Sequence, residues 1–149
     1  MQNGNLLVTS FNTAALLELS ADNGESVREI SLQADIEDPR HGVQLANGQF
    51  VVCHGWRRTL DQVCMVDDHG RVISSYRHVY APVHLAVDEE SQFLYVADME
   101  NNTVALLNST LMFVRDIGER LSNPHRLYLD QTTRLFVGEL DGGISVIQL

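Results

Sequence analysis

The sequence contains no lysine, although it has ten arginines and twenty acidic residues, for a formal net charge of −10. It has two cysteines, Cys53 and Cys64, too few for the disulfide framework of a small secreted domain, and no Cys/His spacing typical of zinc sites. We expect both to be buried thiols. No stretch approaches the roughly 18 consecutive apolar residues of a membrane span, and the first residues show no secretory signal. These absences exclude a catalytic lysine and predict a cytoplasmic globular protein.

The common catalytic motifs are also missing. We find no Ser-His-Asp arrangement, no HExxH and no glycine-rich phosphate loop. The paired acids Asp67–Asp68 and Glu89–Glu90 fall on predicted turns, where solvated charge is the ordinary explanation. The acidic balance also disfavours nucleic acid as a partner, because phosphate backbones are repelled unless the arginines gather on one face. The sequence therefore predicts a binding protein rather than an enzyme.

Proline is scarce but regularly placed. Pro39, Pro82 and Pro124 are the only three prolines, and they lie 43 and 42 residues apart. A period of about 40 residues is typical of solenoids and propellers. After each proline come a short apolar alternation, a polar turn and a second apolar run, which predicts a hairpin. The second strands of these hairpins are expected at 50–53, 93–96 and 135–137.

Further apolar runs predict a third strand in each repeat, and two repeats also have a fourth. The third strands are expected at 63–66, 104–107 and 144–147, and the fourth at 72–76 and 113–117. Four antiparallel strands per period make a β-propeller blade. The sequence thus predicts an all-β propeller fold with about three and a half blades. The expected units are a partial blade at 1–37 (strands two to four), blades at 38–79 and 80–121, and a partial blade at 122–149 (strands one to three).

The second full repeat resembles the NHL repeats of tripartite-motif ubiquitin ligases. The resemblance is carried by Pro82–Asp88, Leu94–Asp98 and Asn101–Val104. It implies a six-bladed propeller of which this chain is the C-terminal half, and a module that binds proteins or recruits substrates for an upstream ligase. The remaining half of the ring is expected to come from an upstream segment or from self-association. RNA binding by the propeller face is a further function known in this group.

The histidines after the prolines suggest an alternative. The segment Pro124–Leu127 is similar to the Pro-His-x-apolar pattern that contains zinc-binding histidines in the propeller of peptidyl-α-hydroxyglycine α-amidating lyase, and His41–Val43 comes near it. Counted back from Val43 and Leu127, His41 and His125 share a register, whereas His84 stands one residue before Leu85 and should face the opposite way. Two aligned histidines do not make a zinc site, so no cofactor is expected. A zinc-dependent lyase remains the alternative.

The partner surface is predicted on the loop after the second strand of the first full blade. There Trp56, Arg57 and Arg58 replace the polar consensus loop. Loops of this kind share a face with the blade-to-blade connections, so the surface should also include His78, Tyr80 and Arg120. Tryptophan, tyrosine and arginine dominate interface hot spots. The competing interpretation is that Trp56 caps its own blade while the arginines pair with local acids.

Overall fold

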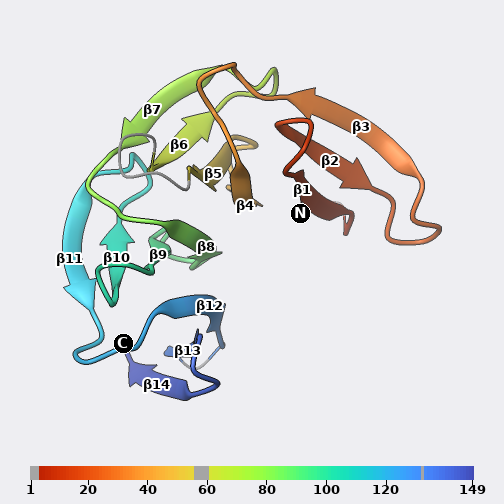
Figure 1. Cartoon of the computed structure of the whole chain (residues 1–149). Coiled ribbons are helices and arrows are strands. Elements are labelled where there is room, and N and C mark those ends of the chain that lie inside the picture. The colour runs from red at the N-terminus through yellow and green to blue at the C-terminus, as the bar shows by residue number, and fades with distance from the viewer. Residues whose placement is uncertain (1–3, 56–60, 132) are drawn as a thin grey trace.

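The computed structural model describes residues 4–55, 61–131 and 133–149. Across these ranges the chain forms fourteen strands, and none of these segments forms a helix that could span a membrane. The strands belong to four antiparallel sheets that follow one another along an arc (Figure 1). The all-β propeller fold expected from the sequence is confirmed.

The first two sheets contain seven strands. The first sheet consists of β1 (Leu6–Ser10), β2 (Ala15–Leu19) and β3 (Ser26–Ser31). The second consists of β4 (Pro39–Gln44), β5 (Phe50–His54), β6 (Gln62–Val66) and β7 (Val72–Tyr76).

The other two sheets repeat this plan. The third sheet consists of β8 (Pro82–Val87), β9 (Leu94–Asp98), β10 (Thr103–Leu107) and β11 (Phe113–Ile117). The fourth consists of β12 (Pro124–Leu129), β13 (Arg134–Glu139) and β14 (Ile144–Gln148). Both four-stranded sheets have their strands in sequence order.

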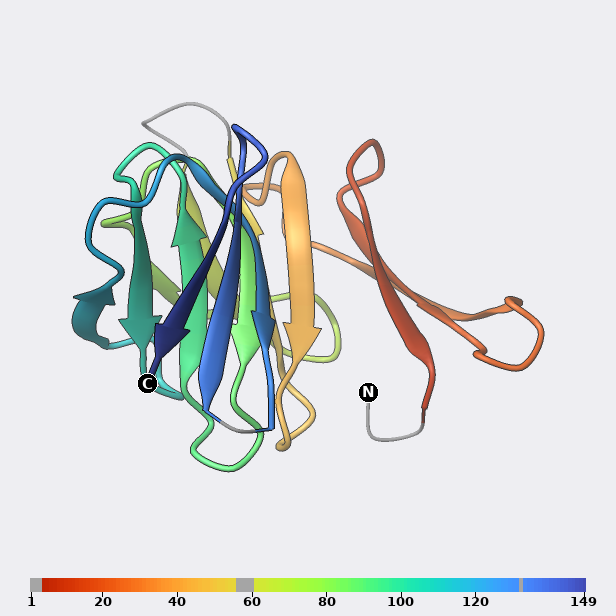
Figure 2. The ribbon, with the colours of Figure 1, turned by 90° about the horizontal axis from the view of Figure 1, so that it is seen from below.

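The strands fan out from the centre of the arc to its rim. β4, β8 and β12 lie innermost, with β4 next to β8 and β8 next to β12, whereas β3, β7 and β11 lie on the rim (Figure 1). In Figure 2 the strands of the last three sheets stand side by side, and the first sheet lies at the N-terminal end of the arc. Side chains at the start of the innermost strands are therefore brought together from segments about 43 residues apart.

The hydrophobic core lies between consecutive sheets rather than inside any one of them. Along β5, Phe50 and Val52 pack toward the first sheet, while Val51 and Cys53 pack toward the third. This division follows from the two-residue period of a strand. Middle strands are buried on both faces for this reason, and the rim strand β11 is largely exposed.

The three prolines begin the three innermost strands, as the sequence predicts. In each case the preceding residue has a positive φ, near +50°, and a bulge follows the proline. A bulge adds one residue to one strand of a pair and re-aims the side chains beyond it. The innermost strands therefore start with the same bend; the residues with positive φ are Asp38, Ala81 and Asn123.

We expect the isolated chain to give an all-β circular dichroism spectrum and to self-associate at micromolar concentration. Within the described chain, the inner edge of β1 and the outer edge of β14 have no partner strand, and Ile144 on β14 is 73% exposed. Unpaired apolar edges promote association. Ile144→Glu should weaken this association. A stable monomer in sedimentation velocity would contradict the expectation.

Candidate functional site

The candidate site lies at the start of the innermost strands. After the bulge, His41 pairs across to β5, His84 to β9 and Arg126 to β13, each two residues after the proline of its strand. These three side chains occupy one structural position in three consecutive sheets. His125 stands one residue earlier, at the bulge itself.

This arrangement corrects the register predicted from the sequence. His41 and His125 were expected to align and His84 to face the opposite way, but His41 and His84 align and their rings stack, with centroids 3.9 Å apart. The prediction was wrong because it took Val43 as the first core-facing residue of its strand. Gly42 holds that buried position instead.

Close packing against the first sheet leaves no room for a side chain at Gly42. A Cβ atom at this position would lie 2.9 Å from the Cδ2 atom of Leu16 and 3.4 Å from the Oγ1 atom of Thr9. Both neighbours belong to the first sheet, so the missing side chain lets β4 approach that sheet closely. Because glycine has no apolar side chain, the hydrophobic pattern of β4 starts at Val43 in the sequence, one residue after the first buried position, Gly42.

The two stacked histidines join the sheets through backbone hydrogen bonds. The Leu85 N–H donates to the Nδ1 atom of His41 at 3.2 Å, and the Leu127 N–H donates to the Nδ1 atom of His84 at 3.4 Å. An innermost strand has no strand beside it at the centre of the arc, so its N–H groups there need other acceptors. Each histidine supplies one to the next sheet.

These contacts determine the position of the imidazole protons. A backbone N–H can only donate, so each Nδ1 atom carries the lone pair, and a neutral ring then has its proton on Nε2. His125 follows the same rule, because the Nη1 atom of Arg126 donates to its Nδ1 atom at 3.0 Å. All three histidines therefore have their Nδ1 lone pairs engaged.

The surroundings keep these histidines neutral. Burial, followed by the charge of Arg126, lowers the pKa of His41 to about 4. Burial, followed by the charges of His41, Arg126 and His125, lowers the pKa of His84 to about 3. The pKa of His125 is also lowered, first by burial and then by Arg126 and Arg40. Near pH 7 the three rings are uncharged donors at Nε2.

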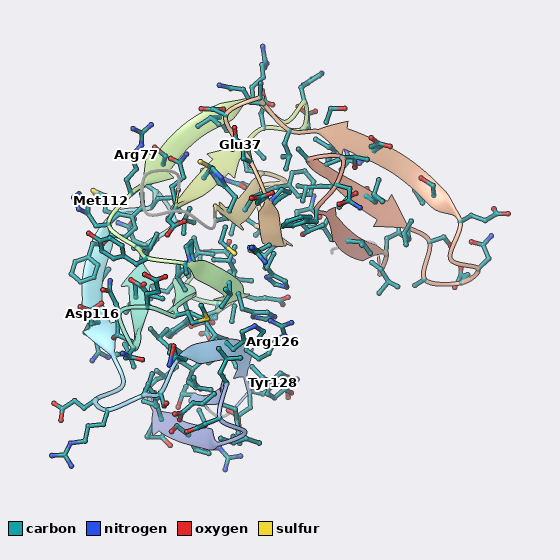
Figure 3. The ribbon with its side chains drawn as sticks, viewed as in Figure 1. Glu37, Arg77, Met112, Asp116, Arg126 and Tyr128 are labelled. Atoms are coloured by element: carbon teal, nitrogen blue, oxygen red, sulfur yellow. The ribbon has the colours of Figure 1, made fainter. Side chains whose placement is uncertain are left out.

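Two arginines complete the cluster. The guanidinium of Arg40 lies over the ring of Phe11, 5.1 Å from its centroid, which anchors it beside the first sheet. Arg126 is exposed, and its side chain lies on the side of β12 opposite the third sheet, as does that of Tyr128 (Figure 3). We call this set the basic ladder, composed of Arg40, His41, His84, His125 and Arg126.

Hydrogen bonds at the Nδ1 atoms of His41, His84 and His125 count against the hypothesis that these histidines bind zinc. A metal needs an imidazole lone pair, and the Nδ1 lone pairs of these rings already accept hydrogen bonds. Among the described residues, the group with metal-compatible spacing is Asp67, Asp68 and His69, on the turn between β6 and β7. Asp67 there accepts the N–H of His69, an ordinary turn contact.

The second strands end in side chains that hold the blade connections in place. Asp98, buried at the end of β9, accepts the Tyr80 N–H at 2.8 Å and the Asn101 side-chain amide at 2.8 Å. Glu139 at the end of β13 accepts the Ser122 N–H at 2.7 Å. Asp98 therefore joins the loop after its own strand, through Asn101, to the connection before its sheet, through Tyr80.

His54 holds the equivalent position in β5 with reversed polarity. Its Nδ1 atom lies 3.2 Å from the Glu37 carbonyl oxygen and must donate to it, so its Nε2 atom accepts from the Cys64 thiol, 3.4 Å away. Burial raises the pKa of Cys64 to about 12 and lowers that of His54. The pair is neutral, which makes Cys64 a poor nucleophile. Cys53 and Cys64 are buried free thiols, as predicted.

The residues predicted for the partner surface are only partly described. His78 and Tyr80 lie exposed in the connection before β8, and Arg120 lies exposed in the connection before β12. Because Asp98 at the end of β9 binds Tyr80, the second-strand ends and the connections share one face. Trp56, Arg57 and Arg58 lie outside the described residues.

A pocket that the sequence did not predict lies at the other end of β8 and β12. It has a volume of about 570 Å³ and combines acidic and aromatic side chains. Two of its acids are engaged locally, since Asp88 binds Ser91 in its own turn and Asp130 pairs with Arg134. The lining includes Asp88, Glu89, Glu90, Tyr95, Tyr128 and Asp130.

We expect the free energy of unfolding to fall as the pH drops from about 6.5 toward the folded pKa values of His41 and His84, because the unfolded chain then binds more protons. His41→Asn with His84→Asn should flatten this dependence, since an asparagine oxygen can replace the Nδ1 acceptor but does not titrate. Asp98, whose pKa burial raises to about 6, gives the opposite slope in both proteins. Urea denaturation across this range measures the effect, and equal slopes would contradict it.

Among known proteins, similarity to this chain is found in solved structures. No family model matches the sequence, and the search of curated proteins found no match. Among solved structures, a protein of unknown function from Bacteroides caccae superposes with a TM-score of 0.79 at 18% identity, over 99% of this chain and 61% of that one.

Two lyase structures are also similar. Virginiamycin B lyase from Staphylococcus aureus matches with a TM-score of 0.65 at 12% identity, over 99% of this chain and 53% of that one. A streptogramin B lyase structure matches with a TM-score of 0.64 at 15% identity, over 98% of this chain and 51% of that one. The chain thus spans less than two thirds of each of these structures. At such identities the similarity shows the fold alone, and the chain is a stretch of β-propeller.

Proposed function

We propose that this chain is a protein-binding propeller module and not an enzyme. The observation that carries the proposal is the state of the inner-strand histidines. His41, His84 and His125 all have their Nδ1 lone pairs engaged by donors. Rings held in this way present N–H groups and cannot readily accept a proton or a metal. The arrangement supports recognition in preference to acid–base chemistry.

The face that carries the blade connections supports protein binding in particular. Side chains at the ends of β5, β9 and β13 hold these connections in place by hydrogen bonds. A surface fixed before binding loses less conformational entropy when a partner docks. Tyr80, 41% exposed, and Arg120 lie on this face and belong to the residue types that dominate interfaces.

The resemblance of Pro82–Asp88 and Leu94–Asp98 to tripartite-motif NHL repeats suggests the setting of this module. In that setting the propeller recruits substrates for a ubiquitin-ligase segment upstream. Trp56, Arg57 and Arg58 belong to the proposed surface on the sequence argument.

A lyase is the second candidate. A catalytically inactive histidine-to-alanine variant of virginiamycin B lyase, solved with quinupristin, matches this chain with a TM-score of 0.64 at 12% identity, over 97% of this chain and 52% of that one. The gathering of three histidines at the start of the innermost strands favours a related activity, whereas the hydrogen bonds at their Nδ1 atoms count against it. Consumption of quinupristin by the protein, abolished by His84→Ala, would move the lyase to first place.

We expect Tyr80→Ala with Arg120→Ala to abolish recovery of the protein's partners in affinity purification. Both side chains are exposed, so the melting temperature should stay within a few degrees. The matched control is Phe113→Ala with Arg115→Ala, which removes an exposed aromatic ring and an exposed arginine from the rim strand β11. The control should keep the partners. If both double variants recover the same proteins as the wild type, this face is not the binding surface.

A further inference from the structure

The basic ladder is positive in a strongly acidic chain. The protein has a formal net charge of −10, yet two arginines and three histidines gather at the start of three innermost strands. Besides burial, the charge of Arg126 lowers the pKa values of all three histidines, and that of Arg40 also lowers the pKa of His125.

The ladder also presents donors and no acceptors. The rings of His41 and His84 stack at an interplanar angle of 20° and use the same atom, Nδ1, toward the same neighbour in the next sheet. With Nδ1 occupied in both rings, Nε2–H is the hydrogen-bond donor that each neutral ring has left. Arg126 donates hydrogen bonds to His125 through one nitrogen, Nη1. A guanidinium has five N–H donors, so the donors on the other two nitrogens can bind a ligand.

We propose that the basic ladder is a binding site for a carboxylate group, held by Arg126 together with the Nε2–H groups of His41 and His84. A guanidinium matches the two oxygens of a carboxylate in a bidentate contact. The imidazole donors fit the same group because their other nitrogens are occupied. A carboxylate is favoured over a nucleic-acid phosphate because the acidic remainder of the protein repels a polyanion.

Tyr128 extends the site along β12. It stands two residues after Arg126, so both side chains lie on the side of β12 opposite Leu127, which packs against the third sheet (Figure 3). The Tyr128 side chain is 66% exposed. Its ring offers an apolar surface to the part of the ligand next to the carboxylate.

The residues of the site differ from those of the proposed protein-binding face. Its side chains lie on β4, β8 and β12, whereas His78, Tyr80 and Arg120 lie in the connections. A small anion needs no protein partner, so the two proposals can fail independently. The carboxylate itself can belong to a small diacid or to an acidic peptide.

The test is an NMR titration of the full chain, read at the backbone amides of Leu85 and Leu127, which donate to the ladder histidines. Two probes are used, succinate and a capped Glu-containing peptide, with inorganic phosphate and chloride for comparison. We expect saturable shifts of both amides with at least one carboxylate probe. The tighter of the two probes identifies the source of the carboxylate.

Variants measure how much Arg126 and the two histidines each contribute to binding. Arg126→Gln should weaken binding at least about tenfold, because a charge-assisted contact is lost. His41→Asn with His84→Asn keeps an acceptor for the neighbouring amides but removes the Nε2–H groups, and should weaken binding several-fold. Arg115→Gln, on the rim strand β11, is the control and should leave the affinity unchanged. Circular dichroism verifies that each variant keeps the all-β spectrum.

Three results would overturn the proposal. The first is an absence of saturable shifts with both carboxylate probes. The second is tighter binding of inorganic phosphate than of either carboxylate, which would favour a phosphate-bearing partner such as RNA. The third is equal affinity of the wild type and a folded Arg126→Gln variant.

Discussion

The backbone N–H groups at the start of the innermost strands need acceptors, and the rest of the site depends on how this need is met. A middle strand has a neighbour on each side, but an innermost strand lacks one at the centre of the arc. His41 and His84 fill the gap by accepting an N–H from the next sheet. These two contacts link consecutive sheets and leave the proton of each neutral ring on Nε2. A structural requirement of the fold thus produces a row of hydrogen-bond donors.

Side chains at the ends of the second strands also form hydrogen bonds with backbone groups of the blade connections. Asp98 and Glu139 accept an N–H from the connection that precedes their own sheet, and His54 donates to a carbonyl at the equivalent place. Three different side chains therefore perform one task. The replacement of a carboxylate by His54 changes the polarity of the contact and brings Cys64 into a neutral pair. Departures from a repeat consensus can preserve the architecture while altering the chemistry of one blade.

The sequence predicted the fold well because its signals are periodic. The spacing of Pro39, Pro82 and Pro124 gave the repeat, and the apolar runs gave the strands between them. The register of the histidines was not predictable in the same way. It depends on a bulge after each proline and on Gly42, whose missing side chain is explained only by the approach of Leu16 from another sheet. Stacking of His41 on His84 likewise joins residues 43 positions apart, which no local pattern reports.

The central claim is that neutral histidines with Nδ1 as acceptor connect the innermost strands. Long-range proton–nitrogen NMR correlations at neutral pH distinguish the two imidazole tautomers and the charged form directly. The account predicts that His41 and His84 are both neutral and carry their proton on Nε2, as the contacts with the Leu85 and Leu127 amides require. Protonated rings, or a proton on Nδ1 in either histidine, would contradict it.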